Sequence, residues 1–217
     1  MSRGLFITLE GIEGAGKSTV ARAICDWLGG RGMRAILTRE PGGTPLAERV
    51  RQIVLEHGEE RLTAATETLL MFAARGIHVE NLIRPALERG DCVVCDRFTD
   101  ASRAYQGAAR GVDPAWIESL ATEVQGGLQP DCTLLLDLPV PTGLERARSR
   151  RAGVADRFEA EAQPFFERVR AGYLELARRE PERIHVIDAA VPLAAVERQV
   201  VAVLERLPLV GNGGRAP

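Results

Sequence analysis

Residues Leu5–Ser18 read LFITLEGIEGAGKS. The apolar, β-prone stretch Leu5–Glu10 predicts a strand, Gly11–Ser18 matches the pattern G-x-x-x-x-G-K-[ST], and helical apolar spacing continues over Ser18–Leu28. In a strand, glycine-rich turn and helix of this order, backbone N–H groups and the helix N-terminus point at bound phosphate. The segment therefore predicts a phosphate loop that binds a nucleoside triphosphate. A turn that merely joins strand to helix is the alternative.

The predicted phosphate loop carries the only lysine of the chain, Lys17, among 28 basic residues. We expect its ammonium group to bridge the β- and γ-phosphates of ATP, and the Ser18 hydroxyl to ligate Mg²⁺. A guanine-reading N-K-x-D motif needs a lysine after asparagine, whereas Lys17 follows Gly16, which argues against a GTPase switch. The predicted ATP-binding residues of the loop are Gly11, Ile12, Glu13, Gly14, Ala15, Gly16, Lys17, Ser18 and Thr19.

Apolar segments farther along the chain predict the rest of the fold. Four more strands are expected at Arg34–Arg39, Cys92–Asp96, Cys132–Leu138 and Ile184–Asp188. Helical spacing marks Leu46–Glu56, Ala64–Glu88, Thr99–Ala109, Pro114–Val124, Thr142–Arg150, Pro164–Arg179 and Leu193–Leu207. This alternation predicts an α/β fold of the P-loop NTPase type, a five-stranded parallel sheet with helices on both faces. Ligands of such sheets bind outside the carboxyl ends of the strands.

Length and composition limit the class of protein. With 217 residues, 45% of them apolar, and a net charge of −2, the chain resembles soluble globular proteins. We expect one compact α/β domain over residues 1–207 and a disordered tail at 208–217. The balanced charge argues against a nucleic-acid partner. Without a stretch of signal-peptide or membrane-spanning length, we expect a cytoplasmic protein with no membrane partner.

The four cysteines include a C-x-x-C pattern, Cys92 and Cys95, of the kind that can form a redox or metal pair. The surrounding CVVCD is strand-like, and residues three apart in a strand point to opposite faces. We therefore expect both, together with Cys25 and Cys132, to be reduced and structural, as is usual in the cytoplasm.

A second charged motif, Asp96-Arg97-Phe98, closes the third predicted strand and so falls at the ligand-binding edge of the sheet. An aspartate there can hold hydrated Mg²⁺, and an arginine can clamp a phosphate with two parallel hydrogen bonds. An ordinary surface ion pair is the alternative.

Five sequence blocks together resemble bacterial thymidylate kinase (dTMP kinase). They read TLEGIEGAGKST, LTREPGGTPLAERVR, LLMFAAR, CDRFTDASRAYQG and ADRFE, and they keep the family's order from about Leu5 to Asp188. The resemblance implies transfer of the γ-phosphoryl group of ATP to dTMP, giving dTDP and ADP, for dTTP biosynthesis. It also implies Mg²⁺ as cofactor and a homodimer. Another deoxynucleotide or nucleoside kinase, or a DNA-associated ATPase, are the alternative functions.

The resemblance implies roles for residues of an acceptor pocket. Arg97 would bind the dTMP phosphate, and Glu13 would accept a hydrogen bond from the sugar 3′-hydroxyl unless it is only a solvent-exposed loop acid. Phe72 would stack on thymine unless it is a core residue of an amphipathic helix. The other implied dTMP-binding residues are Arg39 and Pro41 of the acceptor loop, Arg51, Arg75 and the base-reading Ser102 and Gln106, and Tyr105 beside the sugar 2′ position.

An arginine-rich connector follows the fourth predicted strand and its helix, and it is either a solvated turn or a mobile lid. Its arginines are Arg146, Arg148, Arg150, Arg151 and Arg157. The resemblance implies a subclass with an acidic phosphate loop and a catalytic arginine in a lid at about residues 148–158. Such a lid excludes water and stabilises the charge on the transferred phosphoryl group. Arg157 is the first candidate, and Arg150 and Arg151 follow as ATP-binding residues.

The sequence departs from the family pattern at a few positions. Ile77 replaces a polar residue, Ala108 and Ala109 stand where glycine is common, and the lid is slightly longer than usual. These departures concern packing beside the base and the identity of the lid arginine. They leave the expected phosphate chemistry unaffected. The expected catalytic residues are Lys17, Arg97, Arg157 and Glu13.

Overall fold

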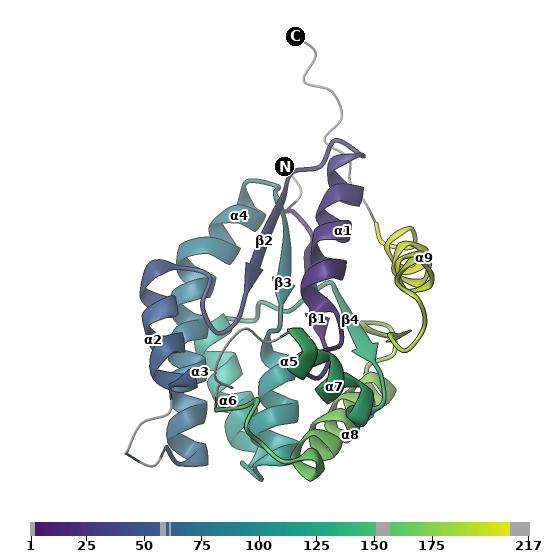
Figure 1. Ribbon diagram of the computed structural model, residues 1–217. Coiled ribbons are helices and arrows are strands. Elements are labelled where there is room, and N and C mark those ends of the chain that lie inside the picture. The colour runs from purple at the N-terminus through teal and green to yellow at the C-terminus, as the bar shows by residue number, and fades with distance from the viewer. Residues whose placement is uncertain (1–2, 57–59, 61, 151–156, 209–217) are drawn as a thin grey trace.

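The computed structural model describes residues 3–208 except 57–59, 61 and 151–156, and Figure 1 shows its arrangement. Its strands are β1 (Phe6–Glu10), β2 (Ala35–Arg39), β3 (Cys92–Asp96), β4 (Cys132–Asp137) and β5 (Ile184–Asp188). They form one parallel sheet in the order β2-β3-β1-β4-β5. The predicted five-stranded parallel sheet is confirmed, and the phosphate-loop strand β1 lies at its centre.

Helices connect consecutive strands and cover the sheet. Their bounds are α1 (Lys17–Gly29), α2 (Pro45–Leu55), α3 (Ala64–His78), α4 (Arg84–Glu88), α5 (Thr99–Ser102), α6 (Pro114–Gln125), α7 (Val140–Arg150), α8 (Gln163–Arg179) and α9 (Leu193–Leu204). Residues 151–156 of the predicted lid and 209–217 of the predicted tail lie outside the described residues. No helix in the described ranges is both long and apolar enough to cross a membrane.

Alternate residues of the central strand face two different layers. Ile7 and Leu9 pack in one apolar cluster with residues of α1 and α9, and these two helices contact each other (Figure 1). Phe6 points to the other face, where its cluster includes Ile83 and Leu87 beside α4. Because both faces are covered, every residue of β1 is buried, as expected for the interior of a parallel sheet.

Two segments differ from the regular helices that apolar spacing predicts. The long stretch after Ala64 contains the π-helical segment η1 (Val79–Ile83), and the stretch after Thr99 continues as π-helical η2 (Arg103–Ala109). A π turn closes i→i+5 hydrogen bonds, so it rotates the following side chains about the helix axis relative to an α-helix. In η2 this change of direction falls where Tyr105 and Gln106 enter the functional site.

The cysteines occupy the positions that strand geometry predicts. Cys92 packs in the cluster on the α1 face, whereas Cys95 packs on the α4 face. All four cysteines, which lie within the described part of the chain, are free thiols. Burial raises the pKa of the Cys132 thiol to about 12, which keeps this group protonated and unreactive.

Candidate active site

The phosphate loop joins β1 to α1 and takes its shape from backbone geometry. Gly11, Gly14 and Gly16 have φ values of 135°, 74° and 91°, a region that residues with a Cβ rarely adopt. A Cβ at Gly14 would also collide with the carbonyl oxygen of Gly143 on α7. The loop therefore needs glycine for its turn and for the close approach of a neighbouring backbone.

Lys17 lies inside the loop and has little contact with solvent. Its Nζ atom donates to the carbonyl oxygens of Gly11 and Ile12, each at 3.0 Å, and the residue is 8% exposed. Burial, followed by the repulsion of nearby Arg97, lowers the pKa of Lys17 to about 8. An ammonium group with so few partners has donor capacity for the oxygens of a bound phosphate.

Ser18 and Asp96 lie together at the ends of α1 and β3, which are distant in sequence. The Ser18 hydroxyl donates to Asp96 Oδ2 at 3.3 Å, and Asp96 Oδ1 is buried without a hydrogen-bond partner. No group of three or more His, Cys, Asp or Glu side chains suited to a metal occurs among the described residues. Mg²⁺ bound through substrate phosphates needs only one or two carboxylates, so the hydroxyl and the unpartnered oxygen fit this ion.

Arg97 and Glu13 form an ion pair next to the phosphate loop. Arg97 Nη2 donates to Glu13 Oε1 at 2.9 Å, and the Tyr105 hydroxyl lies 2.9 Å from both oxygens of the same carboxylate. Arg97 Nη1 also donates to the Tyr173 hydroxyl at 3.3 Å. Arg97 has a φ of 72°, the only positive value for a residue other than glycine in the described ranges. A strained backbone held by several side-chain bonds is typical of functional sites.

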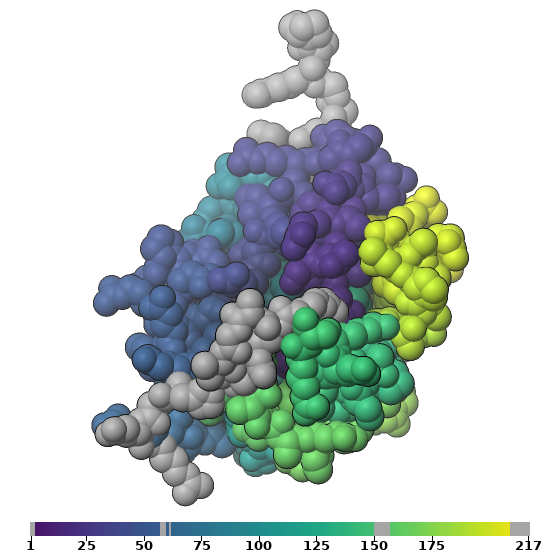
Figure 2. Space-filling view, in the orientation of Figure 1, coloured from purple at the N-terminus to yellow at the C-terminus, as the bar shows by residue number. Residues whose placement is uncertain are grey.

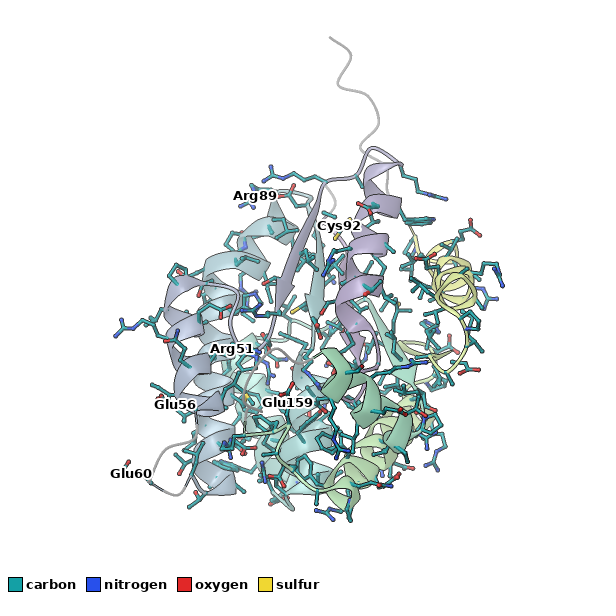
Figure 3. The ribbon with its side chains drawn as sticks, in the orientation of Figure 1. Arg51, Glu56, Glu60, Arg89, Cys92 and Glu159 are labelled. Atoms are coloured by element: carbon teal, nitrogen blue, oxygen red, sulfur yellow. The ribbon has the colours of Figure 1, made fainter. Side chains whose placement is uncertain are left out.

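A cavity of about 360 Å³ extends from this ion pair along the carboxyl edge of the sheet. Figure 2 shows α2 and α7 on opposite sides of this edge, and in Figure 3 Arg51 and Glu159 lie centrally whereas Cys92 marks the other end of the strands. The predicted residues that line the cavity are Glu13, Gly14, Lys17, Arg39, Pro41, Arg51, Arg75, Asp96, Arg97, Ser102, Tyr105 and Gln106.

Arg75 also lines the cavity and is 3% exposed. Its Nε donates to Glu40 Oε2 at 2.7 Å, and its Nη2 donates to the Phe98 carbonyl oxygen and to Ser102 Oγ at 3.0 and 3.1 Å. Its Nη1 is buried and has no partner among the described residues. A buried unpaired guanidinium nitrogen in a cavity wall is a donor for a ligand.

The support behind Arg75 was missed by sequence reasoning. Glu40 accepts from Arg75 and also lies 3.0 Å from His78 Nδ1, and His78 Nε2 lies 2.7 Å from Thr38 Oγ1. All four residues are buried. The signal was present, because Glu40 belongs to the REPGG block, and His78 follows Arg75 by three positions and therefore shares its helix face.

Phe72 is not among the residues that line the cavity, and its stacking on the base stays a prediction. Its ring is 1% exposed and packs with Ile117 and Ala121 of α6. The preceding residue, Met71, lines the cavity instead. One position corresponds to about 100° on a helix, so the apolar spacing alone did not distinguish the two faces. The burial of Phe72 fits the alternative, in which it is a core residue of an amphipathic helix.

Arg157 is likewise not among the residues that line the cavity, although its neighbours Phe158 and Glu159 are, and its role as the lid arginine stays a prediction. Its Nη2 donates to Glu67 Oε2 at 2.6 Å and its Nε to the Val54 carbonyl oxygen at 3.0 Å. The reason is electrostatic, since a buried carboxylate such as Glu67 requires cationic partners. Arg151 lies outside the described residues, and for Arg150 only the backbone of α7 is described.

The chain is similar to known proteins over most of its length. The sequence model of the thymidylate kinase family matches residues 9–200. A thymidylate kinase of Pseudomonas fluorescens (strain SBW25) is 55% identical over 204 residues, which cover 94% of this chain and 96% of the relative. A thymidylate kinase of Alkalilimnicola ehrlichii is 57% identical over 196 residues, which cover 90% of each. The crystal structure of thymidylate kinase from Ehrlichia chaffeensis superposes with a TM-score of 0.74 at 32% identity, covering 93% of this chain and 99% of that one. The chain therefore belongs to the thymidylate kinase family.

Proposed function

We propose that the chain transfers the γ-phosphoryl group of ATP to dTMP, giving dTDP and ADP, with the phosphate loop as donor site and the adjoining cavity as acceptor site. The observation that carries the proposal is the continuity of this cavity. Gly14 and Lys17 of the phosphate loop line the same cavity as Arg75 and Gln106, so side chains suited to phosphate and side chains suited to a base share one space.

The chemistry needs no covalent enzyme intermediate, because an oxygen of the dTMP phosphate is itself the nucleophile. Lys17 would hold the β- and γ-phosphates, and Arg97 would hold the acceptor phosphate in line with them. Their positive charges stabilise the negative charge on the transferred phosphoryl group, while the walls of the cavity position the two substrates.

Ser18 and Asp96 would hold Mg²⁺ through the hydroxyl and the unpartnered carboxylate oxygen. The bound ion would neutralise phosphate charge. Asp96→Asn keeps the volume of the side chain and removes its charge. We expect this variant to need a higher magnesium concentration for half-maximal rate, with wild-type thermal stability as the control.

Glu13 would accept a hydrogen bond from the sugar 3′-hydroxyl. Arg97 and Tyr105 already orient its carboxylate, and an oriented carboxylate has acceptor capacity beyond two bonds. The Tyr105 ring would occupy the space beside the sugar 2′ position. For the lid at about residues 148–158, the bonds of Arg157 support Arg150 or Arg151 as the arginine that acts on ATP.

A homodimer formed through α2 and α3 is also proposed. Leu46 and Ile53 are 52% and 58% exposed and lie two turns apart on one side of α2, and Leu69 of the adjacent α3 is 49% exposed. Large exposed apolar side chains on packed helices favour association. Ile53→Glu should shift the sedimentation equilibrium toward monomer. An unchanged mass would remove this surface from the interface.

Two further properties remain proposals. Free buried thiols support a reducing compartment, the cytoplasm. The single sheet and its continuous core support one domain over residues 1–207.

The test of the function is ADP production measured with a panel of acceptors. We expect dTMP to have the highest kcat/KM, because Arg75 and Gln106 offer hydrogen bonds that suit thymine. A higher value for dCMP, dGMP or thymidine would overturn the acceptor assignment. ATP hydrolysis that DNA stimulates and that yields no dTDP would instead favour a DNA-associated ATPase.

A further inference from the structure

Glu67 of α3 is fully buried, with 0% of its surface exposed. It has no role among the substrate-binding and catalytic residues described above. Three side chains converge on it. Gln106 Nε2 and Arg110 Nε donate to its Oε1 at 2.7 and 2.9 Å, and Arg157 Nη2 donates to its Oε2 at 2.6 Å. These donors come from η2, from Arg110 directly after it and from the segment that precedes α8, so Glu67 connects α3 to both regions.

The chemistry of Glu67 restricts the orientation of the Gln106 amide. A carboxylate in ion pairs accepts hydrogen bonds and donates none. The side of the Gln106 amide that faces Glu67 must therefore be the NH₂ group. The carbonyl oxygen of the amide lies on the opposite side of the same planar group and cannot exchange places with the nitrogen without losing this bond.

Gln106 and Arg75 both line the acceptor cavity, and both are nearly fully buried. Arg75 Nη1, which is buried without a partner, would offer a donor to a base there, and the fixed Gln106 carbonyl oxygen would offer an acceptor. Thymine has a ring N3–H next to the C4 carbonyl oxygen, which is a donor beside an acceptor. Cytosine has an acceptor nitrogen beside an amino group, which is the reverse pattern.

We propose that Glu67 is a positioning residue for base specificity: it locks the Gln106 amide so that the cavity presents an acceptor beside the Arg75 donor, a pattern that selects thymine over cytosine. This inference rests on the proposed function, since it concerns the same acceptor site. Glu67 acts through Gln106 and does not itself line the cavity.

Glu67→Gln tests the lock directly, because the new amide has nearly the same volume but can donate as well as accept. Gln106 would then be free to turn its NH₂ group toward the base. We expect the ratio of kcat/KM for dTMP to that for dCMP to fall at least ~10-fold, the size of one misplaced buried hydrogen bond. Glu67→Asp, which still only accepts, should keep the ratio near wild type even if the KM for dTMP rises.

Two controls separate positioning from general damage. Glu161→Gln removes the other carboxylate that pairs with Arg110, at 2.8 Å, and leaves Gln106 untouched, so its ratio should equal that of wild type. In a Gln106→Met background, Glu67→Gln should lower the ratio no further, because the residue through which it acts is gone.

An unchanged ratio in folded Glu67→Gln, or a full additional fall in the Gln106→Met background, would overturn the inference. If Glu67→Gln melts below the assay temperature, Glu67→Gln with Arg157→Met removes one charge of each sign and provides the same readout. Failure of the proposed function would look different, since wild type itself would then show no preference for dTMP over dCMP.

Discussion

The phosphate loop and the acceptor cavity lie side by side but are held by different interactions. The loop is a run of consecutive residues whose shape depends on glycine backbone angles. We expect it to bind phosphate mainly through its backbone N–H groups. The cavity is assembled from side chains of separate elements and depends on buried ion pairs such as Glu40–Arg75 and Glu13–Arg97. A backbone site is encoded locally, whereas a site of buried ion pairs depends on residues distant in sequence.

The two kinds of site should also fail differently. Removing one partner of a buried ion pair leaves an uncompensated charge and costs about 3–5 kcal/mol. Changing a side chain of a backbone site has little effect unless that side chain is a required glycine or touches the substrate. Few substitutions of loop side chains should therefore lower activity, whereas the cavity should also respond to substitutions of the buried residues that support its lining.

The largest effect is expected for Lys17→Arg, which changes the one charged loop side chain that should hold the transferred phosphate. A planar guanidinium cannot replace a compact ammonium group between the carbonyl oxygens of Gly11 and Ile12. We expect kcat to fall about 10³-fold, as for loss of a preorganised donor to the transition state. Arg22→Lys on the exposed side of α1 is the matched control, and near-normal turnover of Lys17→Arg would contradict the role of Lys17.

The next largest effect is expected for Arg75→Lys on the cavity side. Lysine keeps the charge but cannot bond Glu40, the Phe98 carbonyl oxygen and Ser102 and still present a nitrogen to the base. We expect kcat/KM for dTMP to fall about 100-fold, the effect of about 3 kcal/mol in hydrogen bonds to a charged group. The KM for ATP should stay within a factor of two, and an equal rise in both KM values would argue for a distortion that extends to the phosphate loop.

A smaller effect is expected for Gly43→Ala, because Gly43 lies next to the buried residues that support Arg75. Gly43 has a φ of 86°, and a Cβ there would collide with His78 Nε2 and Thr38 Oγ1. Displacement of His78 should move Glu40 and then Arg75, which would raise the KM for dTMP about 10-fold. Gly32→Ala has a similar φ of 72° but open space around its Cβ, so it controls for backbone strain alone. Equal effects of the two substitutions would show that the cavity does not depend on His78.

Arg157→Ala distinguishes an anchoring arginine from a catalytic one. Loss of its bonds to Glu67 and the Val54 carbonyl oxygen should lower Tm by about 2–6 °C, because part of a buried charge cluster is lost. We expect kcat to change less than ~10-fold, since the guanidinium is bound to Glu67 and Arg157 is not among the residues that line the cavity. A fall in kcat beyond ~100-fold with unchanged Tm would return the catalytic role to Arg157.

The last effect is on stability rather than on turnover, and it is expected at Glu10, the residue before the phosphate loop. Burial, reinforced by Asp100, raises the pKa of this carboxyl to about 8, while Tyr173 and the Phe98 N–H donate to it. Between pH 4.5 and 8 the unfolded chain loses this proton before the folded chain does, so the contribution of Glu10 to stability falls as pH rises.

Glu10→Gln removes that titration and keeps the volume of the side chain. Its Tm relative to wild type should therefore rise between pH 5 and pH 8.5, by the equivalent of about 3 kcal/mol. A constant difference across this range would contradict the raised pKa of Glu10. Paired thermal melts in the same buffers provide the measurement.

Local sequence determined the sheet, the phosphate loop and the free cysteines of this chain. Strand alternation, the position of Lys17 between Gly16 and Ser18, and the opposite facing of Cys92 and Cys95 all depend on neighbours a few residues away. The resemblance to thymidylate kinases added most residues of the cavity. Neither source identified the π turn of η2, because apolar spacing does not record where an extra residue enters a helix.

Only the tertiary structure decided which side chains face the cavity and which are bound behind it. Met71 lines the cavity and Phe72 packs against α6, because one helical position changes the direction of a side chain by about 100°. Arg157 was bound by Glu67, 90 positions earlier in the sequence, because a buried carboxylate requires cations whatever their distance along the chain. The backbone-built loop could be predicted because its geometry is local, and the network of buried charges could not because its partners meet only in the folded chain.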